Sequence, residues 1–161
     1  MDAHDLRRRF HASIDHRYIK NLLANLHHSN PPFPLRALGA GAHFEAYSLE
    51  NNGLRLVVKR AREGFLSNLP GLRRAWIAAM RSIQNSPIPM VPPFELFEEV
   101  DTLAYVMPFG ENLDRPLPAL EVEGLVEALA SRGLEITDYP QFRWIEANPY
   151  IVDWSDLKKS S

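Results

Sequence analysis

Three short apolar segments separated by two turns occupy residues 35–59. The first turn contains Gly39-Ala-Gly41, and the second is Asn51-Asn52-Gly53. Asparagine and glycine both tolerate the positive φ that a tight hairpin turn requires. The last segment is rich in β-branched valine and ends at Lys59. This pattern predicts an antiparallel meander of three strands.

The rest of the chain adds helices and further strands to this meander. The spacing of apolar residues predicts helices over residues 5–28, 70–84 and 120–132, and strands over 94–97, 103–107, 143–145 and 150–152. Residues 108–118 contain three prolines and one glycine, which is typical of a linker. We therefore expect an α+β protein in three parts: a helix in residues 1–30, a sheet with a helix in 31–110, and a smaller part in 111–161.

The segment 5–28 is predicted to be one amphipathic helix. Its apolar residues recur every four positions: Leu6, Phe10, Ile14, Tyr18, Leu22 and Leu26. Its polar face carries arginines, Lys20 and, with His4 just before the segment, five of the six histidines. A basic amphipathic helix can bind a protein partner or a membrane surface, although the simpler interpretation is the solvated face of a packed helix. The histidine spacing does not favour a metal site.

Composition excludes several classes of protein. The net charge of −2 indicates neither nucleic acid nor an acidic tail as a partner, and the absence of cysteine excludes disulfides and thiolate metal sites. No apolar run approaches the ~20 residues of a membrane span. The charged opening residues lack the apolar segment of a signal peptide. We expect a soluble, cytoplasmic protein.

Two features of the meander predict phosphate binding. Glycines between two strands, as in Gly39-Ala-Gly41, let backbone amides approach phosphate oxygens, although a structural hairpin uses the same residues. Lys59 ends an apolar strand, where a lysine is costly to bury unless its charge meets an anion. The alternative for Lys59 is an edge-strand position facing water.

On these residues the sequence resembles the protein-kinase-like superfamily. Residues 39–47 are similar to its glycine-rich loop, and residues 56–59 are similar to the strand that carries its phosphate-binding lysine. Residues 103–110 are similar to the last N-lobe strand and the hinge that grips adenine. On this resemblance Met107 is the gatekeeper, while Pro108, Phe109 and Gly110 form the hinge.

Two aspartates complete the resemblance. Residues 150–154 are similar to the strand that ends in the metal-binding aspartate, here Asp153, in a form typical of small bacterial and aminoglycoside-type kinases. Asp138 stands where the family has its catalytic base. Alternatively, Asp153 caps a turn and Asp138 begins an Asx-turn.

The resemblance implies a protein-kinase-like fold, with a five-stranded antiparallel N-lobe sheet plus a helix, and a minimal helical C-lobe. It also implies ATP and Mg²⁺ as cofactors, because phosphoryl transfer depends on positioning and on neutralising phosphate charge. Gly39, Gly41 and Lys59 would hold the triphosphate, Asp153 would hold Mg²⁺, and Asp138 would orient or deprotonate an acceptor hydroxyl. The implied function is a phosphotransferase whose acceptor the sequence does not identify.

Several residues depart from the family pattern. Phe44 replaces the third glycine of the loop, and the segment 70–84 contains no acidic residue to pair with the lysine. The candidates to replace that missing partner are Glu63, Glu95 and Glu98. Arg143 stands where a second metal-binding residue is expected, and an arginine cannot ligate Mg²⁺. Only eight residues follow Asp153, so we expect a reduced C-lobe.

These departures leave two alternatives to an active enzyme. The chain could be a pseudokinase, a nucleotide-binding or protein-interaction module that uses its basic N-terminal helix for docking. It could also depend on a partner chain that supplies the missing half of the C-lobe.

Overall fold

The computed structural model describes residues 3–27, 30–41, 43–62, 70–99, 102–112, 119–136, 141–146, 148–154 and 157–159. Contacts divide the chain into two units: Met1–Asn68 with Pro93–Phe109, and Leu69–Pro92 with Gly110–Ser161. The described residues form four helices and a five-stranded antiparallel sheet, which confirms the predicted α+β class. No helix in the described part of the chain is both long enough and apolar enough to cross a bilayer.

The first unit is built on the five-stranded sheet. Its strands are β1 (Arg36–Ala40), β2 (Phe44–Asn51), β3 (Leu54–Ala61), β4 (Glu95–Glu98) and β5 (Leu103–Pro108), in the order β1-β2-β3-β5-β4. The predicted meander is confirmed. Asn52 and Gly53, with φ of 52° and 79°, form the two-residue turn between β2 and β3. Positive φ at both positions is what a type I′ hairpin turn requires.

The N-terminal segment forms two helices, so the prediction of one continuous helix over residues 5–28 was wrong. α1 spans Ala3–Ser13 and α2 spans His16–Ala24. Asp15 has an extended backbone, and its carboxylate accepts a hydrogen bond from the Tyr18 amide, so it begins a new helix. The spacing of apolar residues does not reveal this break, because the apolar residues of both helices pack into the same core.

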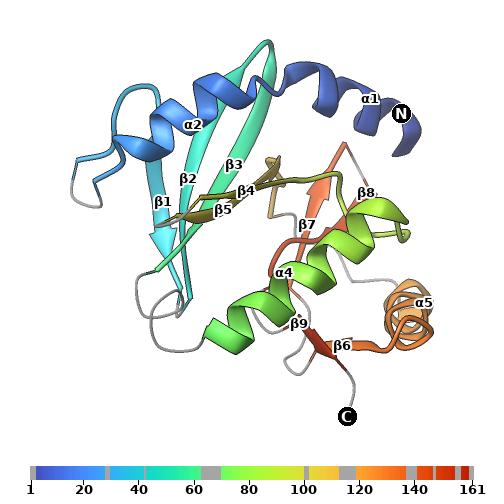
Figure 1. Cartoon of the computed structure of the whole chain (residues 1–161). Coiled ribbons are helices and arrows are strands. Elements are labelled where there is room, and N and C mark those ends of the chain that lie inside the picture. The colour runs from blue at the N-terminus through green and yellow to red at the C-terminus, as the bar shows by residue number, and fades with distance from the viewer. Residues whose placement is uncertain are drawn as a thin grey trace. The chain divides into compact units, whose positions relative to one another are not determined.

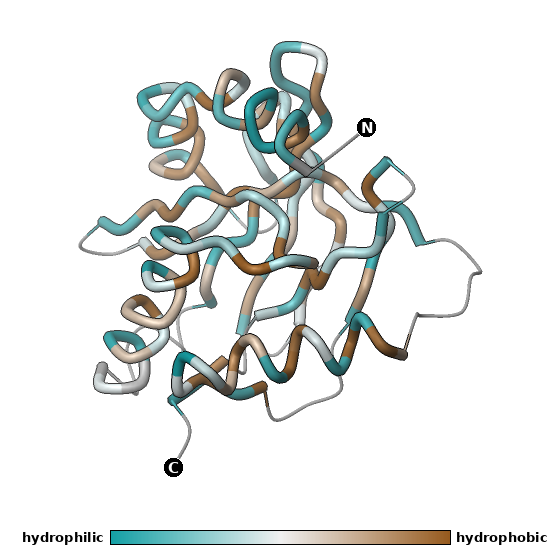
Figure 2. Tube along the Cα trace, turned by 90° about the vertical axis from the view of Figure 1, so that its right-hand side faces the viewer, coloured by the Kyte–Doolittle hydropathy of each residue, from teal (hydrophilic) through white to brown (hydrophobic). Residues whose placement is uncertain are grey.

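Both helices pack on one face of the sheet (Figure 1). Leu56 and Val58 of β3 point into this core, whereas Val57 and Lys59 lie on the opposite face because side chains alternate along a strand. Phe10 is fully buried among these residues. Hydrophobic and hydrophilic residues alternate along the helices and strands in Figure 2.

Part of the basic helical face meets acidic residues of the same unit. His11 Nδ1 lies 3.3 Å and His16 Nε2 lies 3.7 Å from the Glu95 carboxylate. The Lys20 ammonium lies 3.0 Å from Glu99. These side chains are exposed enough that each pair contributes only about 0–1 kcal/mol. The polar face of these helices is therefore not wholly solvated, because His11, His16 and Lys20 contact acidic side chains.

The second unit contains two helices and two small sheets. α4 spans Pro70–Asn85 and α5 spans Ala119–Ala130, close to the predicted limits. β7 (Phe142–Ile145) pairs with β8 (Asn148–Ile151), as expected from the sequence. β6 (Leu134–Ile136) pairs with β9 (Leu157–Lys159), a sheet that the sequence did not predict. α4 makes its contacts in this unit, although the sequence grouped it with the strands. The predicted domain boundaries stay a prediction.

Candidate functional site

Lys59 lies on the central strand of the sheet and in one cross-strand row with Gly39. Gly39 pairs with Ala46, Ala46 pairs with Lys59, and Lys59 pairs with Tyr105. Directly paired residues project from the same face, and neighbouring strands lie about 4.8 Å apart, so Gly39 and Lys59 are about 10 Å from each other. Because β3 has a strand on each side, the edge-strand alternative for Lys59 was wrong.

The gatekeeper candidate lies on the same face. Met107 is two residues from Tyr105 along β5 and pairs with Val57, which is two residues from Lys59 along β3. Residues two apart in a strand share a face. One face of the sheet therefore packs against α1 and α2, and the opposite face carries Gly39, Lys59 and Met107.

The aromatic ring of Tyr105 lies near the partly buried Lys59. Its ammonium nitrogen lies 5.8 Å from the centroid of the Tyr105 ring, within the range of a cation–π contact. Phe44 packs edge-on against Tyr105, with ring centroids 5.4 Å apart, and is 7 % exposed. The residue that replaces the third loop glycine is therefore part of the packed sheet beside Lys59.

The glycine turn between β1 and β2 is closed by backbone hydrogen bonds. The register shifts between Ala37 and Gly39, where Gly39 has a φ of 157°. The Gly41 amide donates to the Phe44 carbonyl over 2.8 Å, and the Arg62 guanidinium donates to the Gly41 carbonyl over 2.9 Å. The Gly41 amide, predicted to meet phosphate, is thus engaged within the turn.

Of the glutamates considered as partners for Lys59, one is excluded. Glu95 pairs with Val106 and contacts His11 and His16, so it lies on the helix-covered face, away from Lys59. Glu98 pairs with Leu103 and lies on the Lys59 face. Glu63 lies outside the described residues.

The hinge candidates span the boundary between the two units. Phe109 closes the first unit, and its amide donates to the Arg55 carbonyl over 2.9 Å. The Arg55 guanidinium stacks 3.7 Å above the centroid of the Phe109 ring. Gly110 opens the second unit, and its amide makes no hydrogen bond to any residue that the structure describes.

Gly110 and Arg143 are in direct contact. A Cβ built at Gly110 would overlap the Cβ of Arg143 and approach Ile145. The neighbouring residues Glu111 and Trp144 exchange two backbone hydrogen bonds of 2.8 Å, which hold the two segments together. Arg143 therefore packs against Gly110.

Replacing Gly110 with alanine is expected to destabilise the second unit by about 1–3 kcal/mol, the usual cost of overpacking. The overlapping atom in Arg143 is its Cβ, which cannot swing away without moving β7. Urea denaturation would measure the loss. Gly124→Ala on α5 is the matched control, since a Cβ there meets nothing within 4 Å. Equal stability of the two variants would contradict the contact.

Asp153 lies in a segment held by hydrogen bonds on both sides. Before it, the Val152 amide donates to the Gln141 carbonyl over 2.9 Å. After it, the Trp154 carbonyl accepts from the Trp76 indole over 2.7 Å. Asp153 is itself half-buried. α4 and the strand before Asp153 thus fix the backbone that carries this carboxylate.

Asp138 lies in the segment 137–140, outside the described residues, and the nearest described residues are Ile136 and Gln141. Ile136 pairs with Leu157, and Gln141 accepts from Val152. Ile136, before the segment 137–140, is thus joined to Leu157, and Gln141, after it, is joined to Val152; Asp153 lies between these two partners in the sequence. Asp153 is the only predicted metal ligand within the described chain, where no three His, Asp or Glu side chains form a metal-binding group.

The sequence matches no known family model, and no curated protein matches it significantly.

Proposed function

We propose that this protein is a kinase-like phosphotransferase that uses ATP and Mg²⁺ on an acceptor still to be identified. The observation that carries the proposal is the row from Gly39 to Lys59, with Met107 on the same face. A central-strand lysine beside a glycine turn is an arrangement suited to a triphosphate, because the ammonium meets phosphate charge where no Cβ intervenes.

The adenine base of ATP would bind at the hinge candidates. The Phe109 amide donates to the Arg55 carbonyl. The Gly110 amide, which makes no hydrogen bond to a described residue, would therefore be the hinge donor to the adenine base. Gly110 also packs so closely on Arg143 that a larger residue would not fit.

The residues present are compatible with Mg²⁺ bound mainly through phosphate. Magnesium in phosphotransferases is held by one or two carboxylates together with substrate phosphates, not by a cage of protein ligands. Asp153 would supply one carboxylate, and Asp138 would supply an acceptor-facing carboxylate. When bound, Mg²⁺ would neutralise charge on the transferred phosphoryl group.

One observation favours a second candidate, a pseudokinase that binds nucleotide without transferring phosphate. Arg143, which stands where a second metal ligand is expected, packs against Gly110 and donates to the Phe142 carbonyl. A fixed guanidinium would repel a second metal ion. The hydrogen bond from the Gly41 amide to the Phe44 carbonyl also favours the pseudokinase, because an amide that is already bonded binds phosphate less well.

Nucleotide titration of the full chain with and without Mg²⁺ tests the proposal, with ADP release as the measure of turnover. We expect Lys59→Ala to weaken ATP binding about 10–100-fold, equivalent to losing a charged hydrogen bond of about 1.5–3 kcal/mol. Lys20→Ala is the matched control, because Lys20 lies on α2 and its ammonium contacts Glu99, so it is not part of the proposed nucleotide site. Asp153→Asn should abolish turnover, while Glu123→Gln on the exposed face of α5 should not.

Each outcome assigns a function. ATP turnover that depends on Mg²⁺ and on Asp153 supports the phosphotransferase. Binding without turnover in the unsubstituted protein would overturn it in favour of the pseudokinase. If Lys59→Ala bound ATP as tightly as Lys20→Ala, the nucleotide site itself would be wrong.

A further inference from the structure

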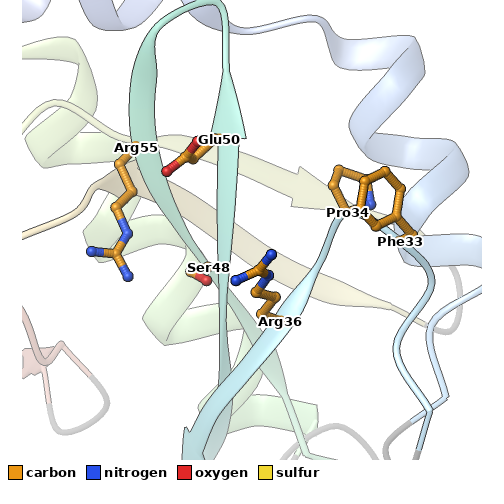
Figure 3. A pocket seen from close by; sticks show the side chains of 6 residues that line it. All are labelled: Phe33, Pro34, Arg36, Ser48, Glu50 and Arg55. Atoms are coloured by element: carbon orange, nitrogen blue, oxygen red, sulfur yellow. The ribbon is translucent and has the colours of Figure 1, made fainter.

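A small pocket of about 210 Å³ opens on the Lys59 face of the sheet, toward the β2–β3 turn. Figure 3 shows the six side chains that line it: Phe33, Pro34, Arg36, Ser48, Glu50 and Arg55. Ser48 lies two residues beyond Ala46 along β2, so the pocket is adjacent to the Gly39–Lys59 row and separate from it. None of the lining residues belongs to the proposed nucleotide site.

Two guanidinium groups flank the floor of this pocket. Arg36 pairs with Ser48 across β1 and β2, and its exposed side chain makes no hydrogen bond or ion pair with any residue in the described ranges. Arg55 lies on the other side of Ser48 in Figure 3, stacked on Phe109. Stacking fixes the Arg55 guanidinium while leaving its N–H donors at the edge of the plane. The pocket therefore offers several N–H donors, and Glu50 is the one carboxylate in its lining.

The floor itself carries the hydroxyl of Ser48. Ser48 is 7 % exposed, and its hydroxyl makes no hydrogen bond within the described part of the chain. Since this side chain lines the pocket, its hydroxyl can donate a hydrogen bond to an acceptor atom placed there.

The remaining lining residues limit the charge and shape of a ligand. Glu50 pairs with Arg55 across the β2–β3 ladder, so two arginines and one glutamate give the lining a net charge of +1. Phe33 is 88 % exposed and forms an apolar wall with Pro34. The volume is below the roughly 300–1,000 Å³ of pockets for larger ligands, so it suits one ring with one anionic group.

We propose that this pocket binds the oxyanion of a small aromatic ligand, either a phosphate monoester or a carboxylate. The oxyanion accepts hydrogen bonds from Arg36, Arg55 and the Ser48 hydroxyl, and the ring lies against Phe33. Charged hydrogen bonds from guanidinium groups are among the strongest that a small anion can form. This site is independent of the proposed nucleotide function.

NMR titration of the full chain with phenyl phosphate, benzoate and phenol tests the proposal. We expect the two anions to shift the amides of Arg36, Ser48 and Arg55 with millimolar affinity, and phenol to shift none. The tighter of the two anions identifies whether phosphate or carboxylate is the preferred group. Inorganic phosphate should bind more weakly than phenyl phosphate, because it lacks the ring that contacts Phe33.

Two substitutions at the same pocket should change affinity in opposite directions. Arg36→Gln should weaken phenyl phosphate binding about tenfold, because it removes a charged donor. Glu50→Gln should tighten binding several-fold, since it removes the one negative charge of the lining. Arg74→Gln, an exposed arginine on α4, is the matched control and should change nothing.

Amide shifts confined to the residues around Lys59, and abolished by Lys59→Ala, would overturn the pocket while leaving the nucleotide proposal intact. No shift with either anion, or equal affinities for Arg36→Gln and Glu50→Gln, would also overturn it. Conversely, phenyl phosphate binding that survives Lys59→Ala and responds to both pocket variants would establish a second site, whether or not ATP binds.

Discussion

Replacing Trp76 with alanine is expected to lower the free energy of unfolding of the second unit by about 3–5 kcal/mol. Trp76 is 1 % exposed on α4, and its indole nitrogen donates to the Trp154 carbonyl over 2.7 Å. The substitution removes the largest buried side chain of the helix and leaves this carbonyl without its indole donor. Urea denaturation followed by circular dichroism would measure the loss.

A graded series separates packing from hydrogen bonding at this position. Trp76→Phe keeps an aromatic ring but loses the donor, so we expect a smaller loss, about 1–3 kcal/mol. Val126→Ala on α5 is a control with little expected effect, because Val126 is 52 % exposed. A loss below about 1 kcal/mol for Trp76→Ala would mean that α4 contributes little to the unit, contrary to the burial of Trp76.

Replacing Arg60 with alanine is expected to destabilise the first unit by about 2–4 kcal/mol. The Arg60 guanidinium donates to the Glu45 carboxylate and to the Leu26 carbonyl, each over 2.8 Å. The side chains of Arg60 and Glu45 are 20 % and 11 % exposed, so the expected loss lies somewhat below the ~3–5 kcal/mol of fully buried pairs. The substitution would also disconnect the end of α2 from the sheet.

The matched control for Arg60→Ala is Arg36→Ala on β1 of the same sheet, whose exposed side chain makes no hydrogen bond or ion pair with a described residue. A double replacement, Arg60→Leu with Glu45→Leu, should recover much of the stability, because no buried charge is then left without its partner. If Arg60→Ala and Arg36→Ala were equally stable, the Arg60–Glu45 contact would contribute nothing to folding.

The same network gives stability a specific dependence on alkaline pH. Burial, and then the hydrogen bond to Glu45, raise the pKa of Tyr47 from 10.0 to about 12. Between these values the folded protein keeps a proton that the unfolded chain has lost. This contribution is therefore fully present below pH 10 and is lost as the pH rises toward 12.

Tyr47→Phe should remove that part of the pH dependence, which urea denaturation at several pH values would measure. Tyr18→Phe is the control, because Tyr18 is 36 % exposed and lies outside the network. An unchanged slope in Tyr47→Phe between pH 10 and 12 would contradict the role of the Tyr47–Glu45 hydrogen bond.

Local sequence patterns were sufficient for most of the secondary structure. Asn52-Gly53 forms a turn by its own backbone preferences, and the apolar alternation on either side needs no distant contact to predict two strands. The stripe that includes Trp76 and Met80 likewise predicts α4 within one residue of its limits. These signals depend on residues close together in the chain, so a single sequence carries them.

The break between α1 and α2 and the β6–β9 pairing were missed for different reasons. Asp15 falls inside the helix predicted for residues 5–28, and a carboxylate becomes an N-cap only when its backbone leaves the helix. β6 and β9 have three residues each, too few for a periodic pattern, and Leu134 pairs with Lys159 only because the fold brings them together.

For the candidate site, the sequence identified Gly39 and Lys59 singly as residues suited to phosphate. It was the register of the β-ladders, with a shift at Gly39, that aligned them in one row and turned Glu95 to the opposite face. A slip of one residue would have exchanged those faces. Amino-acid types thus determined what each side chain can do, while strand pairing between distant segments decided which of them meet, as the Arg36–Ser48 pocket also illustrates.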